Sequence, residues 1–119
     1  MINRQAAEKK GRRAESLALW LLRLKGYKII KARYKTPVGE IDIIAKKAGT
    51  LVFIEVKARK KQEAALHALG PKQQRRIERA ARLYLRRSGH TGPVRFDLMV
   101  KSEDHFFVKH LKAAWRPSQ

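Results

Sequence analysis

The chain has 119 residues, of which 29 are Lys or Arg and 10 are Asp or Glu, so its net charge is +19. This length predicts one domain over residues 1–119, and the 44% hydrophobic content suffices for a folded core. The absence of cysteine excludes disulfides, thiolate zinc sites and thiol nucleophiles. The longest uncharged apolar run, residues 16–22, is too short to cross a membrane. No secretory segment follows Met1, so we expect a cytoplasmic protein whose charge suits a polyanion, with nucleic acid first.

The amino-terminal third predicts one helix behind a loose lead-in. Residues 1–10 lack a sustained apolar stripe, and the helical pattern begins near Arg12. Glu15 lies at the border of that stripe, where a glutamate is ordinarily a surface ion-pair partner. Gly26 predicts the end of the helix. The stripe itself has the spacing of one helix face and comprises Ala14, Leu17, Ala18, Leu21 and Leu22.

Three strands are predicted next. Residues 27–34 form the first, and a break at residues 36–39 separates it from two strongly apolar runs at 41–45 and 51–57. Gly49 and its neighbours, residues 46–50, predict a hairpin turn between these two runs. Both runs are apolar on both faces, which is typical of central strands covered by helices on both sides.

The remainder predicts a second long helix and a closing pair of strands. Residues 58–71 are basic and irregular, with a short helical piece near 63–69, and the helix covers residues 72–87. Residues 94–100 and 105–111 are read as strands, and residues 115–119 as a loose tail. The predicted order is α-β-β-β-α-β-β, a mixed sheet with helices packed on it. One face of the second helix carries a basic row at Arg75, Arg79, Arg82 and Arg86.

Two acids stand inside the most apolar strands. Asp42 and Glu55 would be costly to bury unless they are paired or bind a metal. Glu55 and Lys57 project from one face of a strand, about 7 Å apart. A hairpin turning at residues 46–50 puts residue 42 opposite residue 54 or 55. If 42 pairs with 55, both carboxylates and Lys57 converge in a hard-oxygen site suited to Mg²⁺ or Mn²⁺, and Glu15 could add a third carboxylate.

Simpler interpretations stand beside this one. Glu55 and Lys57 can be an ordinary ion pair at a strand end, and Asp42 can be structural. The Arg row can be a solvated helix face, although only Glu78 offsets it in that helix. Asp97 can simply pair with Arg95. The four histidines, at positions 67, 90, 105 and 110, show no metal-ligand spacing and receive no role.

Two segments carry a family resemblance. Residues 39–45 (GEIDIIA) and 52–59 (VFIEVKAR) together resemble the YraN-like family of small bacterial proteins, distant relatives of archaeal Holliday-junction resolvases in the restriction-endonuclease-like superfamily. The likeness extends over residues 11–100. It implies a three-layer α/β/α core with a central mixed sheet. It also implies metal ligands at Asp42, Glu55 and the Val56 carbonyl, a catalytic Lys57 and an additional helical acid at Glu15.

The sequence departs from the family pattern near its second helix. The family's usual lysine aligns with Gln73, and Lys72 stands one place earlier. Which of the two fills that position stays open, and so does the role of Glu40, two residues from Asp42. Phosphate contacts are predicted from residues of this helix and from one residue of the basic stretch before it: Lys72, Gln73, Arg75, Arg79, Arg82, Arg86 and Arg59.

The prediction is a metal-dependent endonuclease acting on DNA, structure-selective for junctions or flaps rather than sequence-specific. A homodimer is expected by analogy with resolvases. The main alternative is a module that binds nucleic acid without cutting it; a partner of ribosomal RNA or of a protein assembly is another. Membrane association requires a free apolar face, and none is expected. A stacking platform for single strands is also not expected, because Trp20, Phe53 and Phe96 look like core residues.

Overall fold

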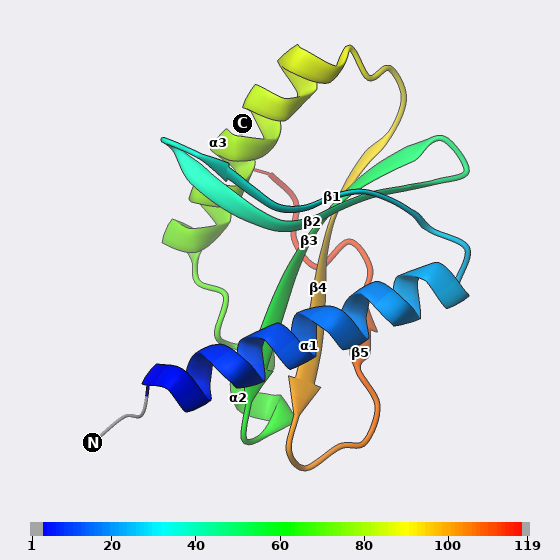
Figure 1. The fold of residues 1–119 in the computed structure, drawn as a ribbon. Helices are drawn as coiled ribbons and strands as arrows, with labels where there is room; N and C mark the ends of the chain where they lie inside the picture. Colours follow the sequence, from blue (N-terminus) through cyan, green and yellow to red (C-terminus); the bar gives the residue numbers. More distant parts are fainter. Residues whose placement is uncertain (1–3, 118–119) are drawn as a thin grey trace.

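Five strands and three helices make up the described part of the protein. A computed structural model describes residues 4–117 (Figure 1). The elements in chain order are α1 (Arg4–Leu24), β1 (Lys28–Thr36), β2 (Gly39–Lys47), β3 (Thr50–Arg59), α2 (Gln62–Leu66), α3 (Pro71–Ser88), β4 (Val94–Ser102) and β5 (Lys109–Leu111). This is the predicted α/β class and order, with α2 as the short helical piece expected before the second long helix.

The strands form one mixed sheet in the order β1-β2-β3-β4-β5. β3 and β4 are parallel, and the other neighbours are antiparallel. The β2–β3 hairpin turns at Ala48 and Gly49, whose φ angles of 50° and 82° are positive as a tight two-residue turn requires. The parallel pair needs a crossover, which α2 and α3 supply.

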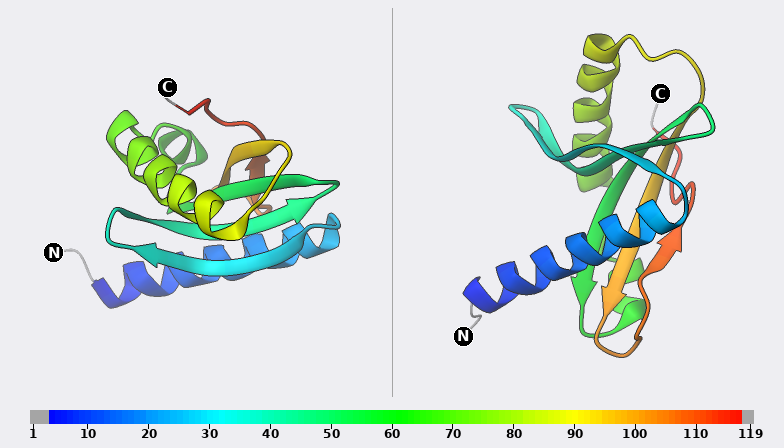
Figure 2. Two further views of the ribbon diagram at one scale, coloured as in Figure 1. Left: turned by 90° about the horizontal axis from the view of Figure 1, so that it is seen from above. Right: turned by 45° about the vertical axis from the view of Figure 1, so that its right-hand side comes forward.

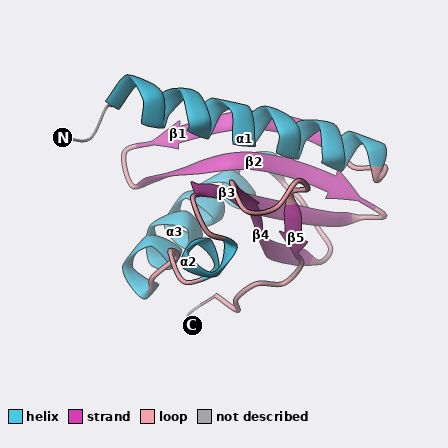
Figure 3. Ribbon diagram, turned by 90° about the horizontal axis from the view of Figure 1, so that it is seen from below, coloured by secondary structure: helices cyan, strands magenta, loops and turns pink. Residues whose placement is uncertain are grey.

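Helices cover the sheet on both faces, so the architecture has three layers. α1 crosses one face, and α2 and α3 lie on the other (Figures 2 and 3). The core under α1 joins Ala18 and Leu22 to sheet residues such as Ile43, Ile54 and Met99. The core under α3 joins Ile77, Ala80 and Ala81 to Tyr34, Ile41, Ile44, Phe53 and Phe96. β2 and β3 are therefore buried on both faces, as their apolar sequences predicted.

The β1–β2 hairpin is held against α3 by a close backbone approach. A Cβ at Gly39 would lie 2.4 Å from the carbonyl oxygen of Arg76, so only glycine fits there. Gly39 opens the strand that carries Asp42. This contact therefore fixes the end of the sheet on which the predicted site depends.

Both predicted loose ends need correction. α1 begins at Arg4, so residues 4–10 are helical rather than a lead-in, and residues 1–3 lie outside the described residues. The Trp115 ring packs on Phe96 with centroids 5.2 Å apart, so the tail is anchored at its start. Residues 118–119 lie outside the described part.

Three further expectations were wrong. Trp20 is 64% exposed instead of buried, and Leu17, assigned to the buried stripe, is 44% exposed. The closing strand covers only residues 109–111 of the predicted 105–111. The buried line of α1 is narrower than predicted and consists of Ala14, Ala18 and Leu22. Among residues 4–117, we find no helix with the length and apolar character needed to span a membrane.

Candidate metal and nucleic-acid site

The candidate site lies where β2 and β3 separate. The two strands pair from Lys47 and Thr50 as far as Ile43 and Ile54, and the pairing ends there. β2 then continues beside β1 alone, and β3 beside β4 alone. The next positions in this register are 42 and 55, one of the two alternatives that the hairpin turn allowed. Two carboxylates therefore stand at the fork between two diverging strands, which is visible in Figure 1.

The carboxylate of Asp42 accepts a hydrogen bond from the β3 backbone at the fork. The Val56 N–H donates to Asp42 Oδ2 at 2.8 Å. Because β2 no longer runs beside β3 at this point, the side chain accepts the hydrogen bond that a neighbouring strand would otherwise accept. The sequence placed Asp42 in an apolar strand, and the structure adds this bond to the β3 backbone.

Glu55, Lys57 and Gln73 form a connected group on the side of the sheet that α3 covers. Lys57 Nζ lies 3.4 Å from Glu55 Oε1 and donates to Gln73 Oε1 at 3.0 Å. The Gln73 amide donates in turn to Glu55 Oε1 at 2.9 Å. Gln73, rather than the exposed Lys72, thus faces the two strand residues. The first turn of α3 delivers it there, because Pro71 begins that helix.

The negative charge of Asp42 disfavours the ionisation of Glu55. Burial, followed by the charge of Asp42, raises the pKa of Glu55 to about 8, and Lys57 opposes this only in part. Burial also raises the pKa of Asp42 against the hydrogen bond from Val56. Like charges that share a buried site produce this pattern. A cation between them would relieve it.

Glu15 faces the same region but is already paired. Arg33 Nε donates to Glu15 Oε1 at 3.2 Å, so the structure realises the ion-pair interpretation of this residue. Glu15 nevertheless lines a pocket of about 320 Å³ with Asp42. The other lining residues come from α1, β1, β2 and β3 and are Glu8, Gly11, Arg12, Arg33, Lys35, Glu40, Ile41 and Val56.

The donor set fits a hard divalent ion held by few protein ligands. Within residues 4–117, no three His, Asp or Glu side chains gather into a cluster that could hold a metal. The fork offers two carboxylates, Asp42 and Glu55, beside the Val56 carbonyl, while Glu15 is paired with Arg33. Mg²⁺ is commonly bound through one or two carboxylates while it keeps several waters. Two neighbouring carboxylates would suit that mode.

The predicted phosphate contacts are mostly exposed, with one exception. The basic row of α3, Arg75, Arg79, Arg82 and Arg86, is exposed along the length of the helix. Arg59, at the end of β3, is exposed and donates to the carbonyl of Ala58. Gln73 is the exception, since its amide already bridges Glu55 and Lys57. The row starts at Arg75, two residues after Gln73, and at about 100° per residue it lies on the side of α3 opposite to the side that faces Glu55 and Lys57.

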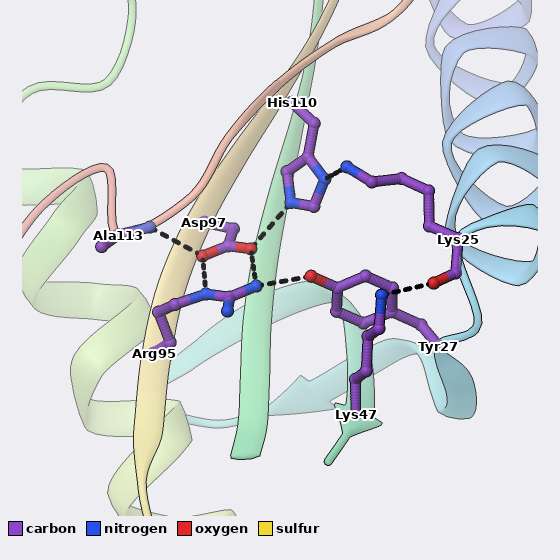
Figure 4. Close-up of polar contacts among 7 residues, drawn as sticks. All are labelled: Lys25, Tyr27, Lys47, Arg95, Asp97, His110 and Ala113. Atoms are coloured by element: carbon purple, nitrogen blue, oxygen red, sulfur yellow. Dashed lines mark hydrogen bonds and ion pairs between the residues drawn. The ribbon is translucent and has the colours of Figure 1, made fainter.

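A second buried carboxylate network lies elsewhere in the sheet (Figure 4). Asp97 on β4 accepts from Arg95 Nε and Nη2, each at 2.8 Å, and contacts His110 Nε2 at 2.7 Å. The Ala113 N–H donates to it at 2.9 Å. Arg95 also donates to the Tyr27 hydroxyl. This confirms the predicted Arg95 pair and adds partners from β5 and from the turn after α1.

The surroundings of Asp97 stabilise its charge. Burial alone would raise its pKa, but hydrogen bonds from His110, Arg95 and Ala113 outweigh burial and lower the pKa to about 2. Lys25 Nζ lies 2.6 Å from the other ring nitrogen of His110. Sequence reasoning missed His110 and Lys25, because their spacing from Asp97 carries no local signal. The network joins α1, β4 and β5, which is a structural role.

Comparisons with known proteins identify the family. The family model described as "Uncharacterised protein family UPF0102" matches residues 14–100. A UPF0102 protein of Parvibaculum lavamentivorans is 47% identical over 94% of this chain and 85% of its own length. Relatives from Maricaulis maris and Thermotoga neapolitana are 43% and 44% identical, over 96% and 80% of this chain and 91% and 92% of their own. The chain therefore belongs to the UPF0102 family, which is the YraN-like family that residues 39–45 and 52–59 predicted.

Proposed function

We propose that the protein is a divalent-metal-dependent endonuclease that hydrolyses phosphodiester bonds in DNA and selects its substrate by structure. The observation that carries this proposal is the β2–β3 fork. There, Asp42 and Glu55 occupy matching register positions, and Lys57 lies 3.4 Å from Glu55. Two adjoining carboxylates with raised pKa values are costly in an apolar sheet. A bound cation would offset the free-energy cost of burying the two carboxylates, and it would give them a function.

The residues at the fork would have different roles in hydrolysis. Asp42, Glu55 and the Val56 carbonyl would hold Mg²⁺ or Mn²⁺, which would polarise a phosphoryl oxygen and lower the pKa of a bound water. Lys57, whose ammonium lies 3.4 Å from Glu55, would orient that water and stabilise the charge that develops on phosphorus. Gln73 holds the Lys57 ammonium beside Glu55 through its amide oxygen.

The charge of the protein supports a nucleic-acid substrate. A net charge of +19 and an exposed arginine row on α3 favour contacts with the phosphate backbone. Such contacts carry no sequence information. Selection by the shape of the nucleic acid follows more naturally from this surface than base reading does.

One observation favours the alternative of a non-catalytic nucleic-acid-binding module. Glu55, Lys57 and Gln73 satisfy one another's hydrogen bonds, so this trio is also stable as a purely structural network. Asp42 separates the two hypotheses. The hydrogen bond from Val56 needs only an acceptor, which an asparagine would also provide, whereas the charge of Asp42 raises the pKa of Glu55.

The test is cleavage of a substrate panel in Mg²⁺ or Mn²⁺ against EDTA. The panel holds linear duplex, flap, four-way junction and single-stranded DNA, with duplex RNA beside them. We expect metal-dependent cutting by the parent protein. Lys57→Ala should lower the rate at least about 100-fold, a loss typical of removing one group that stabilises transition-state charge.

Two controls give this experiment its meaning. Lys46→Ala removes one exposed lysine from the opposite end of β2 and should cut like the parent. Asp42→Asn combined with Glu55→Gln should bind DNA and cut nothing. If Lys57→Ala cuts as fast as Lys46→Ala, the proposed mechanism is wrong. Salt-sensitive binding without cutting of any substrate would favour the binding module.

A further inference from the structure

An exposed apolar surface lies beside α1 and has no function in the proposed site. Its helical part is Trp20 at 64% exposure, with Leu17 and Leu24 at 44% and 81%. These three residues have the i, i+3, i+7 spacing of one helix face. Its loop part is Phe106 and Phe107, at 87% and 77% exposure, between β4 and β5. We call these five residues the aromatic surface.

Contacts at both ends hold the loop alongside α1. Lys10 bonds to Glu103 at 2.5 Å near the amino end of the helix, and Lys25 Nζ lies 2.6 Å from His110 Nδ1 just beyond its carboxyl end. Between them, Val108 packs into the core cluster that α1 shares with the sheet. Residues 103–110 therefore follow α1 lengthwise and bring the two phenylalanines to the flank that carries Leu17.

A basic crest separates the aromatic surface from the pocket that Asp42 lines. The pocket meets α1 on its other flank, at Glu8, Gly11, Arg12 and Glu15. The exposed crest of the helix between the two flanks carries three cations, Lys9, Arg13 and Arg23. An α-helix with its side chains is about 10–12 Å across. A strand leaving the pocket could therefore cross this crest along its positive charges and reach Trp20.

The chemistry of the surface indicates which partner it fits. Three of its five members are aromatic rings, whose faces accept any nucleobase by stacking. The phenylalanine rings are perpendicular with centroids 5.0 Å apart, so they present faces in two directions. A second copy of the chain would bring another +19 to the same place and is disfavoured by repulsion. The acids of the loop are engaged within the protein, Glu103 with Lys10 and Asp104 with His105 and the Gln62 N–H.

We propose that the aromatic surface binds unpaired bases of single-stranded nucleic acid. This rests on the proposed function for its biological meaning, and it then names the substrate class as branched DNA with a single-stranded arm, such as a flap. The branch point lies at the pocket that Asp42 lines, and the arm crosses the crest of α1 to stack on Trp20 and the phenylalanines.

The experiment measures binding in EDTA, so it does not depend on cleavage. The chain has two tryptophans, and Trp115→Phe leaves Trp20 as the only one. Single-stranded oligothymidylate should quench the Trp20 fluorescence, and blunt duplex of equal length should quench it less. Trp20→Ala should weaken single-strand affinity about 5- to 150-fold, equivalent to about 1–3 kcal/mol for one stacked base. Duplex affinity should stay unchanged.

Val38→Ala is the matched control, since it trims an exposed apolar side chain that lies outside the aromatic surface, in the turn between β1 and β2. It should keep single-strand affinity, whereas Phe106→Ala with Phe107→Ala should lose part of it. These side chains are exposed, so the variants should fold, and thermal melts verify this. The Trp115→Phe background is checked the same way, because Trp115 packs on Phe96.

Each outcome decides the proposal. Equal single-strand affinity for the parent and Trp20→Ala overturns it. A blue shift of Trp20 with phosphatidylglycerol vesicles, together with loss of vesicle binding in Leu24→Ala and no quenching by DNA, assigns the surface to lipid instead. Concentration-dependent dimerisation abolished by Trp20→Ala assigns it to a second copy. Base stacking without cleavage of any substrate upholds this inference and contradicts the proposed nuclease function. Cleavage without base stacking upholds the nuclease function and contradicts this inference.

Discussion

Two groups of buried carboxylates in one sheet have opposite electrostatics. Asp97 on β4 is surrounded by donors from Arg95, His110 and Ala113, which lower its pKa to about 2. Asp42 and Glu55 at the β2–β3 fork face each other, and their pKa values are raised. The net charge of the chain is +19, so a shortage of Lys or Arg side chains does not explain the difference between the two groups.

This difference distinguishes a structural carboxylate from one that needs a ligand. Asp97 has every hydrogen bond that a buried carboxylate requires, and it joins β4 to β5 and, through His110 and Lys25, to the end of α1. At the fork, two carboxylates share one cation, Lys57, and the hydrogen bonds of the Gln73 amide and one backbone N–H. The remaining negative charge is what a divalent cation would neutralise.

The largest effect is expected when the Asp97 group is broken. Asp97→Asn leaves the partly buried guanidinium of Arg95 without its counter-charge at a fully buried position, so the free energy of unfolding should fall by about 3 kcal/mol. Urea denaturation measures this. Glu103→Gln, which removes an exposed pair with Lys10, is the control and should leave the midpoint unchanged. A midpoint for Asp97→Asn equal to that control would contradict a structural role for Asp97.

The same group predicts a pH dependence. Because the folded pKa of Asp97 lies below its ordinary value of 3.8, its stabilisation is complete above about pH 4 and is lost as the pH falls toward 2. The shift from 3.8 to about 2 corresponds to about 2 kcal/mol. The stability difference between the parent and Asp97→Asn should therefore narrow over this interval. A difference independent of pH would show that charge is not the cause.

The equivalent substitution at the fork should have the opposite sign. Asn at position 42 can still accept the Val56 N–H, and it removes the negative charge beside Glu55. At pH 7 without divalent ions, Asp42→Asn should raise the free energy of unfolding by about 1 kcal/mol. Chemical denaturation in EDTA measures this change. Destabilisation as large as that of Asp97→Asn would mean that Asp42 is structural.

The smallest effect concerns the basic helix. Arg79 is exposed in the middle of the α3 row. If the row contacts phosphates, Arg79→Ala should weaken binding equally for all duplex sequences and reduce the salt slope by about one unit. Duplex binding titrations at several salt concentrations measure the slope. An unchanged slope would assign Arg79 to a solvated face, whereas a sequence-dependent loss would mean base contact.

The sequence predicted the sheet and the fork well because both follow from local rules. Alternating and continuous apolar runs identified β2 and β3, and a turn at Gly49 set their register. That register left two alternatives, and the observed one extends to Asp42 opposite Glu55. The resemblance aligned Gln73 with the position of the family's usual helix lysine. Its bridge between Glu55 and Lys57 was not predicted, because it depends on where α3 meets the sheet.

The wrong predictions concern which side chains other parts of the fold cover. The apolar periodicity of one segment does not encode this. Leu17 fits the apolar stripe of α1, yet the sheet covers only the line of Ala14, Ala18 and Leu22. Trp20 was assigned to the core by residue type alone, and it is exposed. The partnership of His110 with Asp97 depends on a short strand that forms only at residues 109–111. Such long-range contacts leave no pattern in a single sequence.

The most direct measurement is Mn²⁺ binding to the folded protein, followed by electron paramagnetic resonance at neutral pH. The parent and Glu103→Gln should each bind one Mn²⁺ per chain, and Asp42→Asn combined with Glu55→Gln should bind none at the same concentrations. Competition by Mg²⁺ should release the Mn²⁺. If the parent binds no Mn²⁺, or if the double variant binds as the parent does, the fork is not a metal site.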